Sequence, residues 1–293
     1  MKVCPFEKMS IRQITIVGTG LIGGSLGLAL KQADFAGEIV GCDKRTVLEM
    51  AQARNAIDRA EADLERAIVG SDVIVLATPV GCILSQLEAI GPMVPPTALI
   101  TDAGSTKQRF VERARELFGG QAVQRVLPGH PMAGKEFGGI EHAEANLFRD
   151  AVWLITPIDS TENYTAGQQD YLQLLRSIGA RIIAMNAERH DRLCAWISHL
   201  PQMIATALAS VLRDELVDDD AVTQIGGRAL REMTRIAHSP YSMWRDIALT
   251  NTENIEDALL RFEQHLAHLR ENLRGPDLRG IFEDANKFGK TGV

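Results

Sequence analysis

The feature that most constrains the fold is a glycine-rich loop, GTGLIG, at residues 18–23. It lies between an apolar run at residues 14–18, which favours a β-strand, and a helical pattern at residues 21–32. A G-x-G-x-x-G sequence alone is weak evidence, but its position between a strand and a helix is typical of a dinucleotide-binding unit. We therefore expect a nucleotide-binding domain to begin here.

Each position of this loop has a physical reason. Gly18 permits the tight turn, Gly20 lets a pyrophosphate approach the backbone, and Gly23 lets the helix pack closely on the strand. The first helical turn, with Leu21 and Ile22, offers free N–H groups and the positive end of the helix dipole to phosphates. These five residues are candidate cofactor ligands.

An acidic residue indicates which dinucleotide is bound. Asp43 follows Gly23 by 20 residues and ends the next apolar run, at residues 38–42. A carboxylate there accepts hydrogen bonds from ribose hydroxyls and repels a 2′-phosphate, so we expect NAD. Lys44 and Arg45 come next and weaken that preference, so NADP is not excluded.

Further short apolar runs alternate with helical segments. They lie at residues 73–78, 98–101, 126–127 and 151–156. Continuous apolar strands separated by helices predict a doubly wound, Rossmann-type α/β fold with a parallel sheet covered on both faces. Thr78 and Pro79 end one strand at the edge where such sheets bind ligands, so they are also candidate cofactor contacts.

The second half of the chain has helical periodicity only. We therefore expect a nucleotide-binding domain at residues 10–185 and an all-helical domain at residues 186–293. Pro201 is expected to kink or break the first long helix, and an acidic run at residues 218–220 is expected to be a loop.

Charge and cysteine content exclude several classes of protein. The net charge is −7, from 31 basic and 38 acidic residues without a basic block, so we expect no nucleic-acid partner. The N-terminus does not resemble a secretion signal, and polar residues and a proline interrupt the apolar stretch at residues 195–212, so we expect no membrane span. The four cysteines lack the spacing of metal ligands or a redox pair, which predicts no metal site and a cytoplasmic location.

Several polar residues are candidates for chemistry. His130 is flanked by Gly and Pro after a strand, and imidazole is a suitable base near neutral pH. Ser105 follows another strand end, where it is expected to cap the next helix and to lie near a bound nicotinamide. His199 lies on a predicted helix, and Arg235 has apolar neighbours, which leaves either an internal ion pair or a bound carboxylate.

Five blocks of this sequence resemble the prephenate/arogenate (cyclohexadienyl) dehydrogenase family of tyrosine biosynthesis. They are VGTGLIGGSLGLAL, TDAGSTK, PGHPMAGKEFGG, SHLPQ and MTRIAHSPYSMWRDI, in the family's order over most of the chain. The resemblance implies a nucleotide-binding domain followed by a helical dimerisation domain. It also implies NAD-dependent oxidative decarboxylation of prephenate, arogenate or both by a homodimer.

The same resemblance implies roles for particular residues. His130 is similar to the family's catalytic histidine, and Ser105 to the serine that bonds the same substrate hydroxyl. Arg235 is similar to the arginine that binds the ring carboxylate, and His199 to a substrate-pocket residue. Glu136 matches an acidic position near the pocket entrance in some members.

Two alternatives remain at this point. A dehydrogenase of the β-hydroxyacid type also joins this cofactor fold to helices, but it relies on a lysine in the helical half. No lysine lies between Lys135 and Lys287, which argues against that type. The other alternative is a non-catalytic, NAD-binding regulatory module.

Overall fold

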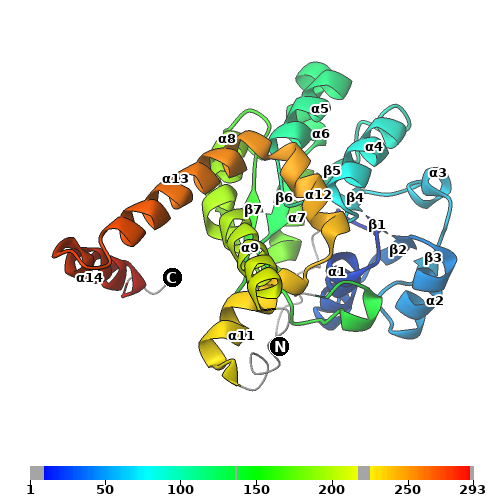
Figure 1. Ribbon diagram of the computed structural model, residues 1–293. Helices are drawn as coiled ribbons and strands as arrows, with labels where there is room; N and C mark the ends of the chain where they lie inside the picture. The colour runs from blue at the N-terminus through cyan, green and yellow to red at the C-terminus, as the bar shows by residue number, and fades with distance from the viewer. Residues whose placement is uncertain (1–9, 136, 217–224, 291–293) are drawn as a thin grey trace, which may run out of the picture.

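The computed structural model describes residues 10–135, 137–216 and 225–290, so Glu136 and the acidic run at 218–220 lie outside the described residues. The first half contains a parallel sheet of five strands in the order β3-β2-β1-β4-β5 (Figure 1). The strands are β1 (Gln13–Val17), β2 (Glu38–Cys42), β3 (Arg59–Ala60), β4 (Val73–Leu76) and β5 (Leu99–Asp102). The direction of winding reverses between β1 and β4, which is where such sheets bind ligands.

Helices cover both faces of this sheet, as the continuous apolar strands predicted. In β4, Val73 and Val75 face one hydrophobic cluster, and Ile74 and Leu76 face the other. The helices that follow the strands are α1 (Leu21–Gln32), α2 (Arg45–Ala53), α3 (Leu64–Ala67), α4 (Val80–Ile90), α5 (Gln108–Phe118) and α6 (Ala122–Arg125). Between α5 and α6 lies η1 (Gly119–Gln121). The doubly wound fold is confirmed.

A second sheet of three strands follows, and here the sequence prediction was partly wrong. β6 (Gly129–Pro131) pairs antiparallel with β7 (Val152–Ile155), and β7 pairs parallel with β8 (Arg181–Ala184). The predicted strand at 126–127 makes only a single bridge, from Val126 to Ile100. Pro128 lacks an N–H for the ladder, and the chain leaves the first sheet there. Between these strands lie η2 (Ile140–His142) and α7 (Ala166–Ser177).

The rest of the described chain is helical, as predicted. The elements are α8 (Ala187–Cys194), η3 (Ala195–His199), α9 (Leu200–Glu215), α11 (Arg228–Thr234), η4 (Arg235–His238), α12 (Tyr241–Thr250), α13 (Thr252–Glu271) and α14 (Asp277–Gly289). Figure 1 shows α13 projecting away from the sheets, with α14 at its far end.

Of the kink or break predicted at Pro201, the break does not occur, because the helix accommodates the proline with a π turn. The helix runs without interruption over residues 187–215, and the Leu200 N–H bonds to the Ala195 carbonyl within η3. This wider turn immediately precedes Pro201, which occupies the first turn of α9. The π turn offers room where the pyrrolidine ring would otherwise meet a carbonyl one turn earlier.

This long helix is also apolar enough, by length and composition, to cross a membrane. Its polar residues His190, Asp191, His199 and Gln202 are buried within the fold, as in a helix that packs inside a folded domain. Only 28% of its most apolar window is buried, however.

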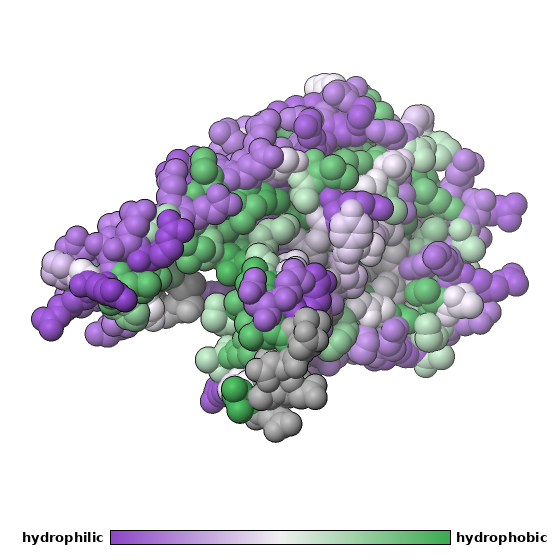
Figure 2. All heavy atoms as spheres, viewed as in Figure 1, coloured by the Kyte–Doolittle hydropathy of each residue, from purple (hydrophilic) through white to green (hydrophobic). Residues whose placement is uncertain are grey.

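Figure 2 shows hydrophobic residues gathered between α9 and α13. The exposed side chains on these helices and on α14 include Ile197, Val211, Leu260, Leu266, Phe282 and Phe288.

The helical half contacts the edge of the sheet where the parallel strands end. Asp246 of α12 accepts a hydrogen bond from the Gly81 N–H in the first turn of α4, at 3.0 Å. The hydroxyl groups of Thr106 and Thr250 lie 2.8 Å apart. An acidic group at a helix N-terminus is stabilising, so the two halves meet in a favourable arrangement around the predicted ligand edge.

Candidate active site

The glycine loop has the geometry that its sequence predicts. Gly18 has a φ of +93°, which favours glycine, and its N–H bonds to the Cys42 carbonyl at 2.8 Å. A Cβ on Gly18 would lie 2.7 Å from Thr78 Cγ2, and a Cβ on Gly23 would lie 1.9 Å from the Gly18 carbonyl oxygen. Both positions therefore require glycine so that β1, β4 and α1 can pack together.

Gly20 has a different surrounding. A Cβ there would meet no atom within 4 Å, and no side chain caps α1, which begins at Leu21. The backbone is thus open to a ligand at the positive end of the helix dipole, together with the N–H groups of Leu21 and Ile22. This open, uncapped helix start fits the pyrophosphate of a dinucleotide.

Asp43 lies at the end of β2 beside this loop. One carboxylate oxygen accepts from the Thr19 N–H at 2.8 Å, and the other accepts from the Lys44 N–H at 2.7 Å. Carboxylate oxygens have further lone pairs, so the group can still accept from ribose hydroxyls. Thr78 follows β4 and donates its hydroxyl to Gln86 at 2.7 Å, and Pro79 is exposed at the start of α4.

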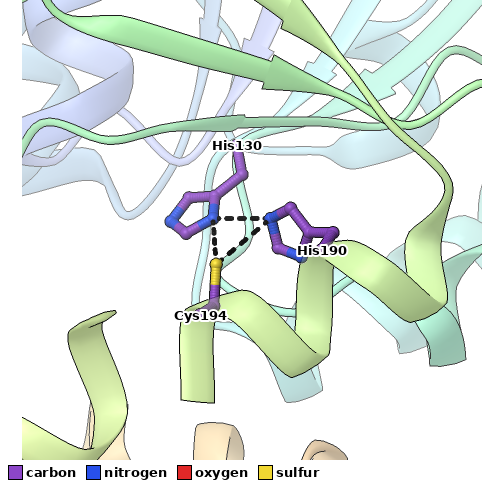
Figure 3. Close-up of side chains that lie close together, drawn as sticks. All are labelled: His130, His190 and Cys194. Atoms are coloured by element: carbon purple, nitrogen blue, oxygen red, sulfur yellow. Dashed lines mark hydrogen bonds between the residues drawn. The ribbon is translucent and has the colours of Figure 1, made fainter. Parts of the chain in front are cut away.

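A second group of residues surrounds His130, on β6. Figure 3 shows the ring of His130 facing His190 and Cys194, which come from successive turns of α8. His130 Nδ1 lies 2.9 Å from His190 Nε2, and His190 Nδ1 lies 2.8 Å from an oxygen of Asp191. The same carboxylate accepts from the backbone N–H groups of Lys107 and Gln108, at 2.7 and 2.8 Å. These contacts form a buried chain from Asp191 through His190 to His130.

This chain fixes which nitrogen of His130 carries the proton. A carboxylate only accepts, so His190 Nδ1 donates to Asp191 and its Nε2 has a free lone pair. His190 Nε2 then accepts from His130 Nδ1–H, which leaves the lone pair of His130 on Nε2. In Figure 3 that nitrogen lies on the far side of the ring from His190 and Cys194. His130 is therefore set up as a proton acceptor.

Burial keeps these imidazoles neutral. Desolvation holds the pKa of His130 well below its usual 6.5, and the electrostatic effects of the nearby His190 and Lys107 lower it further. Desolvation also lowers the pKa of His190, although Asp191 opposes that effect. A neutral His130 at neutral pH is the form that can accept a proton.

A buried ion pair supports the loop that carries Ser105. The Lys107 ammonium pairs with Asp102 at the end of β5, and both side chains are fully buried. Asp102 also accepts from the N–H groups of Gly104, at 2.9 Å, and Gly129, at 3.2 Å. Burial raises the pKa of the Asp102 carboxyl, and the Lys107 contact offsets part of that rise. The pair joins the end of β5 to the start of β6, one residue before His130.

The prediction that Ser105 caps the next helix was wrong. No side chain from its own loop caps α5, which begins at Gln108. Asp191, from the helical half, accepts from the first N–H groups instead. Ser105 is half-buried in the loop after β5, so its hydroxyl is not committed to capping.

A third polar group lies deeper in the helical half. His199 is 1% exposed, and its Nδ1 lies 3.2 Å from the side-chain nitrogen of Asn251. That nitrogen also donates to the Asp191 carbonyl at 2.8 Å, so it acts as a donor and His199 carries its proton on Nε2. Burial lowers the pKa of His199 to about 4. His199 Nε2 and the indole nitrogen of Trp244 are both buried without a hydrogen-bond partner, and the two rings meet edge to face.

Two predicted site residues remain, Arg235 and Glu136. Arg235 begins η4, and its side chain is exposed. Glu136 falls outside the described residues. Sequence reasoning missed His190, Asp191 and Trp244, although His190 and Cys194 have the four-residue spacing that places two side chains on one helix face.

Two family models match almost the whole chain. Residues 26–184 match the nucleotide-binding domain of prephenate dehydrogenase, and residues 186–285 match the prephenate dehydrogenase dimerization domain. A prephenate dehydrogenase from Lactococcus lactis is 33% identical over 282 residues, which cover 95% of this chain and 77% of the relative.

Solved structures agree with this match. Prephenate dehydrogenase from Aquifex aeolicus, in complex with hydroxyphenyl propionate and NAD⁺, is 28% identical and has a TM-score of 0.83, with 97% of each chain covered. Synechocystis arogenate dehydrogenase is 30% identical with a TM-score of 0.76, and the match covers 96% of this chain and 100% of that one. The chain therefore belongs to the prephenate dehydrogenase family.

Proposed function

We propose that this chain catalyses the NAD-dependent oxidative decarboxylation of prephenate, arogenate or both. The observation that carries the proposal is the buried chain Asp191–His190–His130, which leaves a neutral imidazole with its lone pair on Nε2. Membership of the family and the relatives named prephenate and arogenate dehydrogenase support the reaction class.

The cofactor is held by the loop between β1 and α1. Gly18 and Gly23 shape the loop, and Gly20, Leu21 and Ile22 offer backbone to the pyrophosphate. Asp43 accepts from the ribose hydroxyls, and Thr78 and Pro79 lie at the adjacent strand end. When bound, NAD⁺ supplies the hydride acceptor.

His130 provides the base. The substrate ring carries a hydroxyl group, and oxidation of that carbon requires the hydroxyl proton to be removed. His130 Nε2 accepts it, and the hydrogen bond from Nδ1 to His190 stabilises the imidazolium that forms. Ser105, with its free hydroxyl, orients the same substrate hydroxyl. Departure of the ring carboxylate as CO₂ then makes the ring aromatic, so the protein supplies mainly position and a base.

The substrate's anionic groups need donors. The unpartnered N–H groups of His199 and Trp244 are buried donors, which cost free energy unless a ligand accepts from them. We assign His199 to substrate binding on this ground. Arg235 binds the ring carboxylate through its guanidinium fork. Glu136 is assigned to substrate binding from the family resemblance alone.

We also propose that the working unit is a cytoplasmic homodimer. The match to a dimerization domain and the exposed apolar residues on α9, α13 and α14 support an interface between two copies. The free thiols of Cys42, Cys82 and Cys194 agree with a reducing compartment. We place the boundary between the nucleotide-binding and helical domains at residues 185 and 186, between β8 and α8.

The test is a direct assay of the purified chain. NADH formation is followed with NAD⁺ and either prephenate or arogenate, and the product is identified by chromatography. The expected result is NADH formation with at least one substrate, as the hydroxyphenyl product appears in equal amount. If neither substrate reduces NAD⁺ while the chain still binds it, the proposal fails in favour of a binding module.

A further inference from the structure

The proposed reaction does not use a thiol that lies beside the two histidines. Cys194 Sγ lies 3.6 Å from His190 Nε2 and 4.0 Å from His130 Nδ1. Those two nitrogens are themselves 2.9 Å apart. Figure 3 shows the three atoms facing a common point. Imidazole nitrogen and thiolate sulfur are ligands that zinc commonly binds in proteins.

The separations match the geometry of a tetrahedral ion. Zinc lies about 2.0–2.1 Å from imidazole nitrogen and about 2.3 Å from sulfur, so its ligand atoms are separated by roughly 3.3–3.6 Å. The separations among His130, His190 and Cys194 range from 2.9 to 4.0 Å. Small rotations of the two rings, which move each nitrogen by a few tenths of an ångström, would accommodate the ion.

The surroundings also suit a metal. Metal-binding histidines commonly donate their second N–H to a carboxylate, which fixes the ring and increases its basicity. His190 does so, because its Nδ1 lies 2.8 Å from Asp191. The negative charges of Asp191 and Asp102 outweigh the single ammonium of Lys107, and Cys194 adds a further negative charge when it binds the ion as a thiolate. His130 is 8% exposed and links the otherwise fully buried cluster to solvent.

We propose that His130, His190 and Cys194 form an inhibitory site for Zn²⁺, which lies on the Nδ1 side of the His130 ring. On binding, the Cys194 thiol releases its proton to solvent, and Zn–S and two Zn–N bonds form. The proton of His130 moves from Nδ1 to Nε2, because Nδ1 now binds the ion. No electron transfer is involved.

The effect on turnover rests on the proposed function. If His130 Nε2 is the atom that accepts the substrate proton, a proton placed there by zinc binding blocks the reaction. Binding itself is independent of that role. Zinc binding therefore tests the metal site, and loss of activity tests the role of His130 as base.

The experiment uses the full chain without a histidine tag. Zn²⁺ is titrated by calorimetry, and Co²⁺ is used as a coloured probe, because a thiolate ligand gives cobalt a charge-transfer absorption. Cys194→Ala removes the sulfur, and Cys82→Ala is the matched control, since Cys82 is an exposed free cysteine elsewhere in the fold. Retained NADH formation and an unchanged circular dichroism spectrum show that each variant folds.

We expect one Zn²⁺ per chain, a sulfur-to-cobalt band, and inhibition that a chelator reverses. Cys194→Ala should keep its activity without zinc, lose the band and bind Zn²⁺ at least about 100-fold more weakly, since even residues behind a ligand typically change affinity 10–100-fold. Cys82→Ala should behave as the wild type. The absence of a cobalt–thiolate band in the wild type, or equal zinc affinity in Cys194→Ala, overturns the site. Zinc binding through Cys194 without inhibition leaves the metal site standing, overturns its inhibitory effect and contradicts the role of His130 as base.

Discussion

Replacement of His190 by phenylalanine tests the chain of hydrogen bonds behind His130. Phenylalanine keeps the ring volume in a fully buried position but removes the acceptor that lies 2.9 Å from His130 Nδ1. His130 becomes an imidazolium during the reaction, and a hydrogen bond to a charged group contributes about 1.5–3 kcal/mol. Each 1.36 kcal/mol of activation free energy changes a rate tenfold. If the stabilisation is lost in the transition state only, kcat should therefore fall about 10–100-fold.

The assay is NADH formation under saturating NAD⁺, with the substrate concentration varied. We expect kcat to fall while KM for both ligands stays within a factor of about two, because His190 acts through His130 rather than on the substrate. His190→Gln should recover much of the rate, since its amide can donate to Asp191 and accept from His130. A His190→Phe variant that folds and retains wild-type kcat would refute the reasoning, as would a glutamine variant no better than phenylalanine.

Three other predictions follow from the same structure. His199 is neutral when folded, with a pKa of about 4 against 6.5 for an ordinary histidine, so its contribution to stability is complete above pH 6.5 and is lost as the pH falls toward 4. That loss amounts to about 3 kcal/mol, and urea unfolding over this pH range should show a smaller decline in His199→Asn. Gly20→Ala should keep the wild-type melting temperature but bind NAD⁺ more weakly by calorimetry, whereas Gly23→Ala should lower the melting temperature, because its Cβ would lie 1.9 Å from the Gly18 carbonyl oxygen. Equal melting temperatures for the two glycine variants would contradict this difference. Arg235→Gln should raise KM for the substrate with little change in kcat, and an unchanged KM would argue against carboxylate binding there.

The nucleotide-binding loop could be predicted in detail because its signals are local. The positive φ of Gly18 and the contacts of Gly23 with Gly18 and Ile16 arise within one βαβ unit, and the backbone at Gly20 has no neighbouring atom within 4 Å of an added Cβ. The second sheet could not be predicted in the same way. β6 has three residues, and its antiparallel pairing with β7 depends on a partner more than 20 residues later.

The site around His130 was only partly visible in the sequence. His130 stood out through its flanking glycine and proline, but His190 and Asp191 lie 60 residues further along, in a helix with no distinctive motif. The side chain that caps α5 is Asp191, and not Ser105 as the sequence predicted. These roles depend on contacts between the two halves of the chain, and the hydrophobic periodicity within each half does not predict such contacts.

The most direct measurement is the turnover of His130→Asn beside its affinity for NAD⁺. Asparagine retains a polar side chain at this position but has no nitrogen lone pair that accepts a proton near neutral pH. We expect kcat to fall about 10²–10⁴-fold, as for the loss of a general base, while calorimetry gives the wild-type affinity for NAD⁺. A variant that still produces NADH at close to the wild-type rate would contradict the assignment of His130 as the base.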